Sequence, residues 1–418
     1  MGQVFSLGGG GEFLDGFDSN IFRRFDFPFE EILQEIRAAA ASVEDDAVFE
    51  FAPSRQGGES GGLGGGVGPE ERFEFRAVPA DGVQVGLKIC GSGHSEYSSV
   101  EVGRSCKCKL EVQVLGAFMS LLVTGSIGID TVETPFGNRP DVIGGSAVYF
   151  AHAASFFTPV RLVGVVGEDC PQNLLDACKG PSINTAGLEI RKGSKTFRWH
   201  GSYIKDMNAA ETVEVDLNVL AERAAKIPQE FLDSRYVFLA NTHPALQLET
   251  LGKLPAVKLS VADTMNLWIQ TERHHLEKLL ARIDGLVLND GEARLLTGQK
   301  NLIVAAREVL KMGPKFVVIK KGEHGCILVS RDDTFVLPAY PADKVVDPTG
   351  AGDSFAGGMM GYLVTQGSLT SATLKRALAF GTVVASFTIS DFSLAGLCSA
   401  TREQIDERWE KFKSAMSF

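Results

Sequence analysis

The apolar positions after Ser120 form short runs that are separated by longer amphipathic stretches. Each run is rich in Val, Ile, Leu or Phe and has the length of a buried β-strand, while the stretches between the runs have helical periodicity. This alternation predicts a mainly parallel sheet with helices on both faces, in which ligands bind beyond the carboxyl ends of the strands. The predicted strands are Leu121–Thr124, Val160–Val165, Tyr236–Ala240, Leu259–Ala262, Gly285–Leu288 and Phe316–Ile319.

The stretch Lys195–Val215 has a different pattern. Phe197, Trp199, Gly201 and Tyr203 alternate with polar residues, which is typical of half-buried strands. We therefore expect this stretch to form strands outside the main sheet.

The first 118 residues differ from the remainder and are predicted to be an N-terminal extension of a domain that spans 119–418. Gly57–Gly68 has the composition of a flexible linker. Around it lie a possible amphipathic helix at about Phe29–Val43 and strand-like pieces at Arg72–Val78 and Val83–Ile89. Met119 would suit a chain start that runs directly into a strand, so a misassigned start codon, a disordered tail and a small regulatory module are all open interpretations.

Composition narrows the functional classes. The chain has 418 residues, of which 44% are hydrophobic and 22% charged, enough for a large core. Its net charge of −11 argues against nucleic-acid binding. The odd number of cysteines, seven, fits a reducing compartment, and polar residues interrupt the most apolar stretch, Val112–Ile129. We expect a cytoplasmic protein without a membrane partner.

The run from Asp347 to Gly358 carries the strongest chemical signal. Gly350 and Gly352 allow the backbone to approach a ligand closely, and the apolar stretch Phe355–Val364 predicts a helix that begins at about Ala351. The N-terminus of a helix presents unpaired N–H groups and partial positive charge. It is therefore suited to stabilise a phosphoryl group during its transfer.

Asp353 falls in the first turn of this predicted helix. A carboxylate there could accept the proton of an attacking hydroxyl group, as a general base does in phosphoryl transfer. A simpler role for Asp353 is to complement the helix dipole, with the neighbouring glycines only making a turn. The complete run favours the catalytic interpretation.

The run resembles the C-terminal signature of the ribokinase, or PfkB, family of carbohydrate and nucleoside kinases. Other landmarks of the family follow in the same order between Ser120 and about Ser393. The resemblance implies an α/β fold of ribokinase-like type, a three-layer sandwich with a mainly parallel sheet and helices on both faces. It also implies a small β lid, built from about 129–141 and 195–215, and the use of ATP and Mg²⁺.

Two further motifs match residues with which the family binds ATP and magnesium, the nucleotide side of the site. Asn289 and Glu292 resemble its Asn-x-x-Glu motif, in which the Glu acts through water on the magnesium ion; taken alone, the motif is a polar loop with a helix cap. Lys320, Gly322 and Gly325 match residues along the ATP phosphates, although the same sequence would suit a hairpin turn.

A second group of positions matches residues with which the family binds the substrate that accepts the phosphoryl group, the acceptor side of the site. Gly144 and Gly145 match the first signature of the family, where backbone amides approach substrate hydroxyls. Asp130 matches an Asp that accepts hydrogen bonds from sugar hydroxyls, and Asn266 lies in a stretch like the family's Asp-x-Asn. Tyr149 replaces an Asn that ribokinases use for ribose, so the resemblance does not identify the sugar.

Asp347 and Thr349 match positions that hold a monovalent cation in many relatives, which makes K⁺ a candidate. We expect ATP-dependent phosphorylation of a hydroxyl of a small sugar-like substrate, with Asp353 as base and Gly350, Ala351 and Gly352 as anion hole. A nucleoside kinase is the alternative if aromatic side chains of the lid stack on a base, and a non-catalytic sugar sensor is the rival outside enzymes. A homodimer formed through the lid is also considered.

Overall fold

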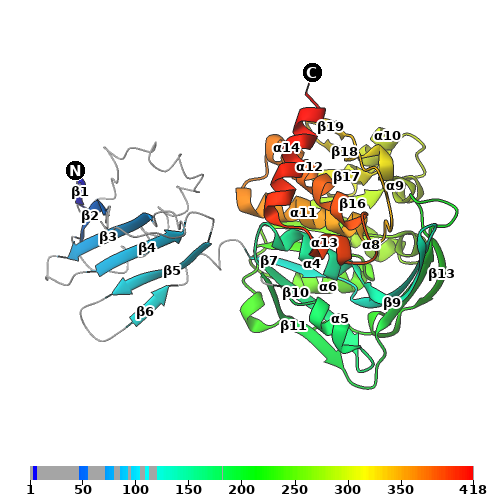
Figure 1. The fold of residues 1–418 in the computed structure, drawn as a ribbon, viewed down its shortest axis with the longest axis horizontal. Coiled ribbons are helices and arrows are strands. Elements are labelled where there is room, and N and C mark those ends of the chain that lie inside the picture. Colours follow the sequence, from blue (N-terminus) through cyan, green and yellow to red (C-terminus); the bar gives the residue numbers. More distant parts are fainter. Residues whose placement is uncertain are drawn as a thin grey trace, which may run out of the picture. The chain divides into compact units, whose positions relative to one another are not determined.

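The computed structural model describes residues 3–6, 47–54, 71–79, 85–92, 96–103, 109–112, 120–180 and 182–417. Contacts divide the chain into two compact units, Met1–Phe118 and Met119–Phe418. Each unit is described here by itself (Figure 1).

The described part of the first unit is an antiparallel sheet in which successive strands pair in chain order. The strand-like pieces expected near residues 72–78 and 83–89 fall on its third and fourth strands. The expected helix at 29–43 and the glycine-rich segment 57–68 lie outside the described residues. The strands are β1 (Gln3–Ser6), β2 (Ala47–Ser54), β3 (Glu71–Pro79), β4 (Val85–Ser92), β5 (Glu96–Gly103) and β6 (Lys109–Val112).

The second unit is built on a large mixed sheet with the strand order β11-β10-β7-β14-β15-β16-β17-β18-β19. Strands β11 to β17 in this order are parallel, and β18 and β19 complete one edge in antiparallel pairing. All six predicted strands are present. The strands are β7 (Leu121–Thr124), β10 (Val160–Gly167), β11 (Ile183–Arg191), β14 (Tyr236–Leu239), β15 (Leu259–Asp263), β16 (Gly285–Asn289), β17 (Phe316–Lys320), β18 (Cys326–Ser330) and β19 (Thr334–Leu337).

Helices cover both faces of this sheet, so the predicted three-layer α/β fold is confirmed. One face packs against α4 (Ser146–Ser155), α11 (Ala351–Gln366) and α12 (Ser371–Thr388), and the other against α6 (Pro244–Gly252), α8 (Arg273–Leu280) and α10 (Leu302–Lys311). The remaining helices are α5 (Gln172–Ala177), α7 (Asn266–Thr271), α9 (Asp290–Thr297), α13 (Ala395–Cys398) and α14 (Arg402–Ala415), with short 3₁₀ turns η1 (Asn218–Ala221), η2 (Gln229–Phe231) and η3 (Gly322–His324).

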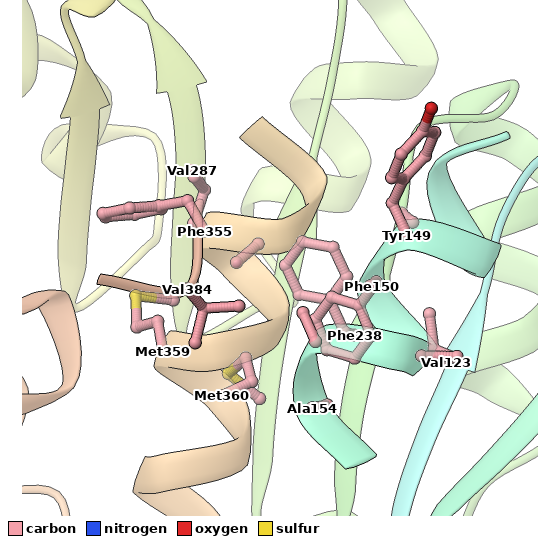
Figure 2. Packing of buried hydrophobic residues seen from close by; sticks show 14 of the residues in the cluster. Val123, Tyr149, Phe150, Ala154, Phe238, Val287, Phe355, Met359, Met360 and Val384 are labelled. Carbon is pink, nitrogen blue, oxygen red and sulfur yellow. The ribbon is translucent and has the colours of Figure 1, made fainter. Parts of the chain in front are cut away.

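The core beneath α4 and α11 is tightly packed. The rings of Phe150 on α4 and Phe238 on β14 stack with centroids 4.3 Å apart, and Met359 and Met360 of α11 belong to the same buried cluster (Figure 2). The two helices therefore meet side by side over the same strands. This contact fixes the N-terminus of α11 relative to the carboxyl ends of the sheet.

A separate four-stranded sheet, the outer sheet, has the strand order β13-β12-β8-β9 and forms outside the main sheet. Its strands are β8 (Gly128–Thr134), β9 (Gly137–Gly144), β12 (Phe197–Ser202) and β13 (Glu211–Asp216), so both stretches expected to form the lid take part. Strand β8 begins shortly after β7 ends, which places this sheet at the carboxyl edge of the main one. Among the described residues, no helix is both long and apolar enough to span a membrane.

Candidate active site

Three neighbouring strands end in polar side chains at the same edge of the sheet. Asp263 is the last residue of β15, Asn289 of β16 and Lys320 of β17, and these strands lie next to one another. Parallel strands bring their carboxyl ends together, so residues distant in sequence become neighbours. Each of these strands extends one residue beyond its predicted apolar run.

The N-terminus of α11 lies against this edge. Gly350 caps the helix with φ of 73°, and a Cβ atom there would lie 2.4 Å from Cγ of the Tyr149 ring. A Cβ atom at Gly352 would lie 2.8 Å from the Lys320 Nζ. Gly350 thus requires glycine for steric and conformational reasons, whereas a side chain at Gly352 would displace the flexible end of Lys320. The Ala351 N–H donates to the Pro348 carbonyl at 3.1 Å, and the partly buried Lys320 cation lies beside this helix end.

Asp353 lies in the first turn of α11 and is partly buried. Burial raises the pKa of its carboxyl to about 7, the Asp263 carboxylate adds to this rise, and Lys320 opposes it. A carboxylate whose pKa lies near neutrality is suited to accept a proton from a hydroxyl group. The role of Asp353 as the base stays a prediction.

The partly buried Lys320 and the buried Asp263 form an ion pair with 3.5 Å between Nζ and Oδ2. Burial alone would lower the pKa of Lys320, but the carboxylates of Asp263 and Glu292 outweigh it and the pKa is raised. Burial raises the pKa of Asp263, and Lys320 opposes that rise. The ammonium group therefore stays charged at the edge where we predict phosphate groups to bind.

Asn289 and Glu292 form a reciprocal cap at the start of α9. The Glu292 N–H donates to Asn289 Oδ1, and the Asn289 N–H donates to Glu292 Oε2, both at 2.7 Å. Burial raises the pKa of Glu292 to about 8, with a further contribution from Asp263 and opposition from Lys320. The structural role that the motif would have by itself is thus present, and the carboxyl also lies beside the ion pair.

Asp130 projects from β8 and is 3% exposed. A Cβ atom at Gly144 would lie 1.9 Å from Asp130 Oδ2, so the carboxyl occupies the space left by this glycine. Among the described residues, Asp130 Oδ1 has no hydrogen-bond partner. Burial, Asp347 and Asp353 raise the pKa of Asp130 to about 8.

Gly145 shapes the start of α4 next to Asp130. Its φ is 105°, and a Cβ atom there would lie 2.4 Å from the carbonyl oxygen of Ser126. The Ser146 N–H donates to Ser126 Oγ at 2.9 Å, and the Ser126 N–H donates to Ser146 Oγ at 3.2 Å. This exchange holds the glycine pair against the end of β7.

Tyr149 of α4 lies close to both Gly350 of the predicted anion hole and Asp130 of the predicted acceptor side. It is 1% exposed, and its hydroxyl has no hydrogen-bond partner of normal geometry among the described residues. Burial, Asp130 and Asp347 raise the pKa of Tyr149, while an interaction with the Ser393 hydroxyl opposes the rise. Its ring supports Gly350, and its hydroxyl extends away from the Phe150–Phe238 core (Figure 2).

Asp347 is 1% exposed and binds backbone groups with both carboxylate oxygens. Oδ1 accepts from the Thr349 N–H at 2.8 Å, and Oδ2 accepts from the Ser393 N–H at 2.9 Å. Thr349 Oγ1 lies 3.4 Å from the Tyr203 hydroxyl of the outer sheet. These contacts give Asp347 a structural role in shaping the loop before α11, whether or not a cation binds nearby.

The remaining predicted residues, Gly322, Gly325 and Asn266, are not part of the cluster formed by Asp263, Glu292, Lys320 and Asp353. Gly322 and Gly325, with φ of 53° and 78°, shape the turn between β17 and β18. Asn266 is exposed at the first position of α7. Asp263, which belongs to the same stretch, is the buried residue that contacts Lys320. The sequence signal for it was a carboxylate directly after an apolar strand.

The chain is similar to a known protein family and to several named kinases. Residues 142–401 match the model described as "pfkB family carbohydrate kinase". The chain is 32% identical over 252 residues to a cytidine kinase of Thermococcus kodakarensis, covering 58% of this chain and 88% of that protein. It is 34% identical over 253 residues to a 2-dehydro-3-deoxygluconokinase of Escherichia coli, covering 54% of this chain and 80% of the relative.

Solved structures agree on the fold. A nucleoside kinase of Methanocaldococcus jannaschii, described as an archaeal member of the ribokinase family, superposes with a TM-score of 0.57 at 20% identity, covering 70% of this chain and 98% of that one. A putative ribokinase II of E. coli in complex with ATP and Mg²⁺ gives a TM-score of 0.56 at 17% identity, covering 70% and 99%.

Proposed function

Because this chain belongs to the pfkB family of carbohydrate kinases, we propose that it transfers the γ-phosphoryl group of ATP to a hydroxyl of a small sugar or sugar-like molecule. One observation carries the proposal. Asp353 lies in the first turn of α11, three residues after the Gly350 cap, with its pKa raised to about 7. A base and an anion cradle thus occur on one helix end.

In the proposed reaction, Asp353 accepts the proton of the acceptor hydroxyl as its oxygen forms a bond to the γ-phosphorus. The bond between that phosphorus and the bridging oxygen breaks, and ADP leaves with the electron pair. The N–H groups of Gly350, Ala351 and Gly352 stabilise negative charge on the phosphoryl oxygens. The backbone cradle does not move a proton, so the two roles stay separate.

The nucleotide side would use the cluster at the ends of β16 and β17. Lys320 supplies a partly buried positive charge, and Gly322 and Gly325 shape the adjacent turn. Asn289 and Glu292 offer polar oxygens next to it, with Glu292 acting on hydrated Mg²⁺ through water. Bound Mg²⁺ supplies positive charge that neutralises the β and γ phosphates. Among residues 120–180 and 182–417, no group of three or more acidic, His or Cys residues is arranged to hold a metal by itself, so phosphate oxygens would complete the site.

The acceptor side would use Asp130. Its buried and unpaired Oδ1 is costly in the free protein, because a buried polar atom without a partner loses its hydration. A substrate hydroxyl would satisfy it, and backbone groups of Gly144 and Gly145 adjoin the same space. Asn266 remains a proposed contact at the rim, since it is exposed at the start of α7.

A nucleoside kinase is the second candidate, because the chain resembles a cytidine kinase and a nucleoside kinase. Aromatic side chains of the lid, and Trp268 of α7, are held by contacts within the protein, which weakens the case for stacking on a base. The Trp268 Nε1–H donates to Asn241 Oδ1 at 3.0 Å, and the Trp199 Nε1–H donates to Thr212 Oγ1 at 3.2 Å. Phe197 packs on Gly128.

A screen of sugars, sugar acids and nucleosides, with ADP formation and product mass as readouts, tests the proposal. We expect phosphorylation of at least one sugar-like compound by the full chain and a rate lower by at least about 100-fold in Asp353→Asn. Preference for nucleosides would select the second candidate. Substrate binding without product formation by the wild type would instead support the non-catalytic sensor and refute the proposal.

Two finer features are also proposed. K⁺ would bind near Asp347 and Thr349, so turnover should be higher in KCl than in an equal concentration of tetramethylammonium chloride.

A homodimer would form through the outer sheet, where β13 exposes Val213 and Val215 at 56% and 44%. A monomeric mass in solution would contradict this second feature.

A further inference from the structure

The loop between β12 and β13 reaches the turn between β17 and β18. Asn208 Nδ2 donates to Glu323 Oε1 at 3.1 Å, and Asn208 Oδ1 accepts from the Glu323 N–H at 3.0 Å. One amide side chain therefore uses its donor and its acceptor on the same residue, 115 positions away in the chain. Such two-point contacts fix orientation as well as distance.

Both sides of this contact are shaped for it. Asp206 Oδ1 accepts from the Asn208 N–H at 2.8 Å, which holds the tip of the loop. On the other side, a Cβ atom at Gly322 would lie 2.2 Å from Asn208 Oδ1. Gly322 also has a φ of 53°, so both its backbone conformation and its contact with Asn208 favour glycine.

The contact joins two regions with different proposed roles. Strand β12 pairs with β8, and Trp199 stands opposite Asp130 in that pairing, so the loop is continuous with the proposed acceptor side. The turn directly follows Lys320, the partly buried cation of the proposed nucleotide side. A displacement of the outer sheet would therefore pull on the turn next to Lys320.

We propose that Asn208 is a positioning residue that ties the outer sheet to the nucleotide turn, so that nucleotide binding also closes that sheet over the acceptor. The inference rests on the proposed function for the identity of the two sides. Asn208 and Glu323 are both exposed, and hydrogen bonds to water compete with theirs. The contact therefore opens and closes reversibly, and its loss changes the ratio of closed to open forms by about tenfold.

The contact can be broken and rebuilt with nearly isosteric side chains. Asn208→Asp removes the donor and places a carboxylate beside Glu323, whereas Glu323→Gln keeps an acceptor for Asn208 and serves as the matched control. The double variant combines Asn208→Asp with Glu323→Gln, so that a Gln N–H can donate to the new Asp. A double-mutant cycle over these four proteins isolates the pair from any general effect on folding.

Hydrogen–deuterium exchange of peptides covering 197–216 measures the opening. In the free protein, we expect exchange about tenfold faster in Asn208→Asp, near wild type in Glu323→Gln and restored in the double variant. Equal exchange in all four proteins would overturn the proposal. Faster exchange in Asn208→Asp that the double variant does not slow again would also overturn the proposal, because the loop would then be destabilised for another reason.

Mg²⁺ with the non-hydrolysable ATP analogue AMP-PNP tests the coupling. Wild type and the double variant should gain protection in 197–216 when the analogue binds, and Asn208→Asp should gain at least about threefold less. Calorimetry on the same samples measures binding of the analogue and so separates the proposed function from the proposed coupling. No binding of the analogue by wild type would refute the proposed function and the coupling with it, whereas binding with identical protection in every variant would refute the coupling alone.

Discussion

The Lys320 ammonium lies 3.5 Å from Asp263 Oδ2, which joins the ends of two strands that are separated by a third. The same ammonium lies beside Gly352 at the start of α11. A positive charge thus stands between a buried carboxylate and the proposed anion cradle. Its field lowers the pKa of Asp353, while the Asp263 carboxylate raises it.

Asp263→Asn should move the acidic limb of the pH profile of kcat/KM to lower pH by about one unit. The substitution removes the negative charge that raises the pKa of Asp353 and leaves Lys320 free to lower it further. The measurement is the rate between pH 5 and 9 with the acceptor found in the screen. Asp332→Asn, at an exposed position, is the control and should leave the limb in place; an unshifted limb in Asp263→Asn would disprove the coupling.

Asp353→Asn should reduce kcat by about 10²–10⁴-fold, because the amide cannot accept the hydroxyl proton. Steady-state rates at saturating ATP provide the measurement. The affinity for Mg²⁺ and AMP-PNP, measured by calorimetry, should stay within about threefold of wild type, since the backbone cradle is retained. A variant that keeps near-wild-type turnover would remove Asp353 from the mechanism.

Glu292→Gln should raise the Mg²⁺ concentration for half-maximal rate by about tenfold, because the variant lacks the carboxylate that bound Mg²⁺ would favour and that would organise the hydrated ion. The Gln carbonyl can still accept from the Asn289 N–H, so the cap of α9 is kept. Glu292→Ala also loses the acceptor of the Asn289 N–H, although the backbone N–H at 292 still donates to Asn289 Oδ1, so this variant should in addition lower the melting temperature. Identical magnesium titrations of wild type and Glu292→Gln would show that the carboxyl serves the helix cap only.

Asp130→Asn should stabilise the protein increasingly as pH rises from 5 to 8. The folded pKa of Asp130, about 8, lies above its unfolded value, so the folded state binds the extra proton in this window. Stability is therefore lost as pH rises through the window, and the amide variant escapes this loss. We expect the difference in melting temperature to grow by roughly 3–6 °C.

Thermal unfolding at several pH values measures this effect, with Asp332→Asn as the exposed control whose difference should not vary with pH. The same Asp130→Asn protein should bind the acceptor more weakly and leave the KM for ATP nearly unchanged. A pH-independent difference in melting temperature would contradict the raised pKa. An equal effect on both substrates would contradict the assignment of Asp130 to the acceptor side.

A chain that starts at Met119 should fold and retain turnover within about threefold of the full chain, because every candidate site residue lies in the second unit. Circular dichroism and the ADP-formation assay on matched samples give the comparison. An insoluble or inactive protein would show that the first unit supports the second. Intact-mass analysis of the native protein asks separately whether synthesis begins at Met119.

The sequence by itself determined the features that depend on local patterns. Runs of apolar residues located the strands of the main sheet, because a buried strand must be apolar on both faces. The alternation around Phe197–Tyr203 separated the outer strands from that sheet. Gly350 and Gly352 indicated a cradle, since few other residues allow the backbone to approach so closely.

The tertiary structure decided which of these residues meet. Strand order brings Asp263 rather than the exposed Asn266 to Lys320, and it places Tyr149 behind Gly350. Burial and distant carboxylates together raise the pKa of Asp130, and neither can be read from its neighbours in the chain. The contact of Asn208 with Glu323 likewise spans two sheets. Such relationships depend on distances between elements, and a sequence pattern constrains only the residues within one element.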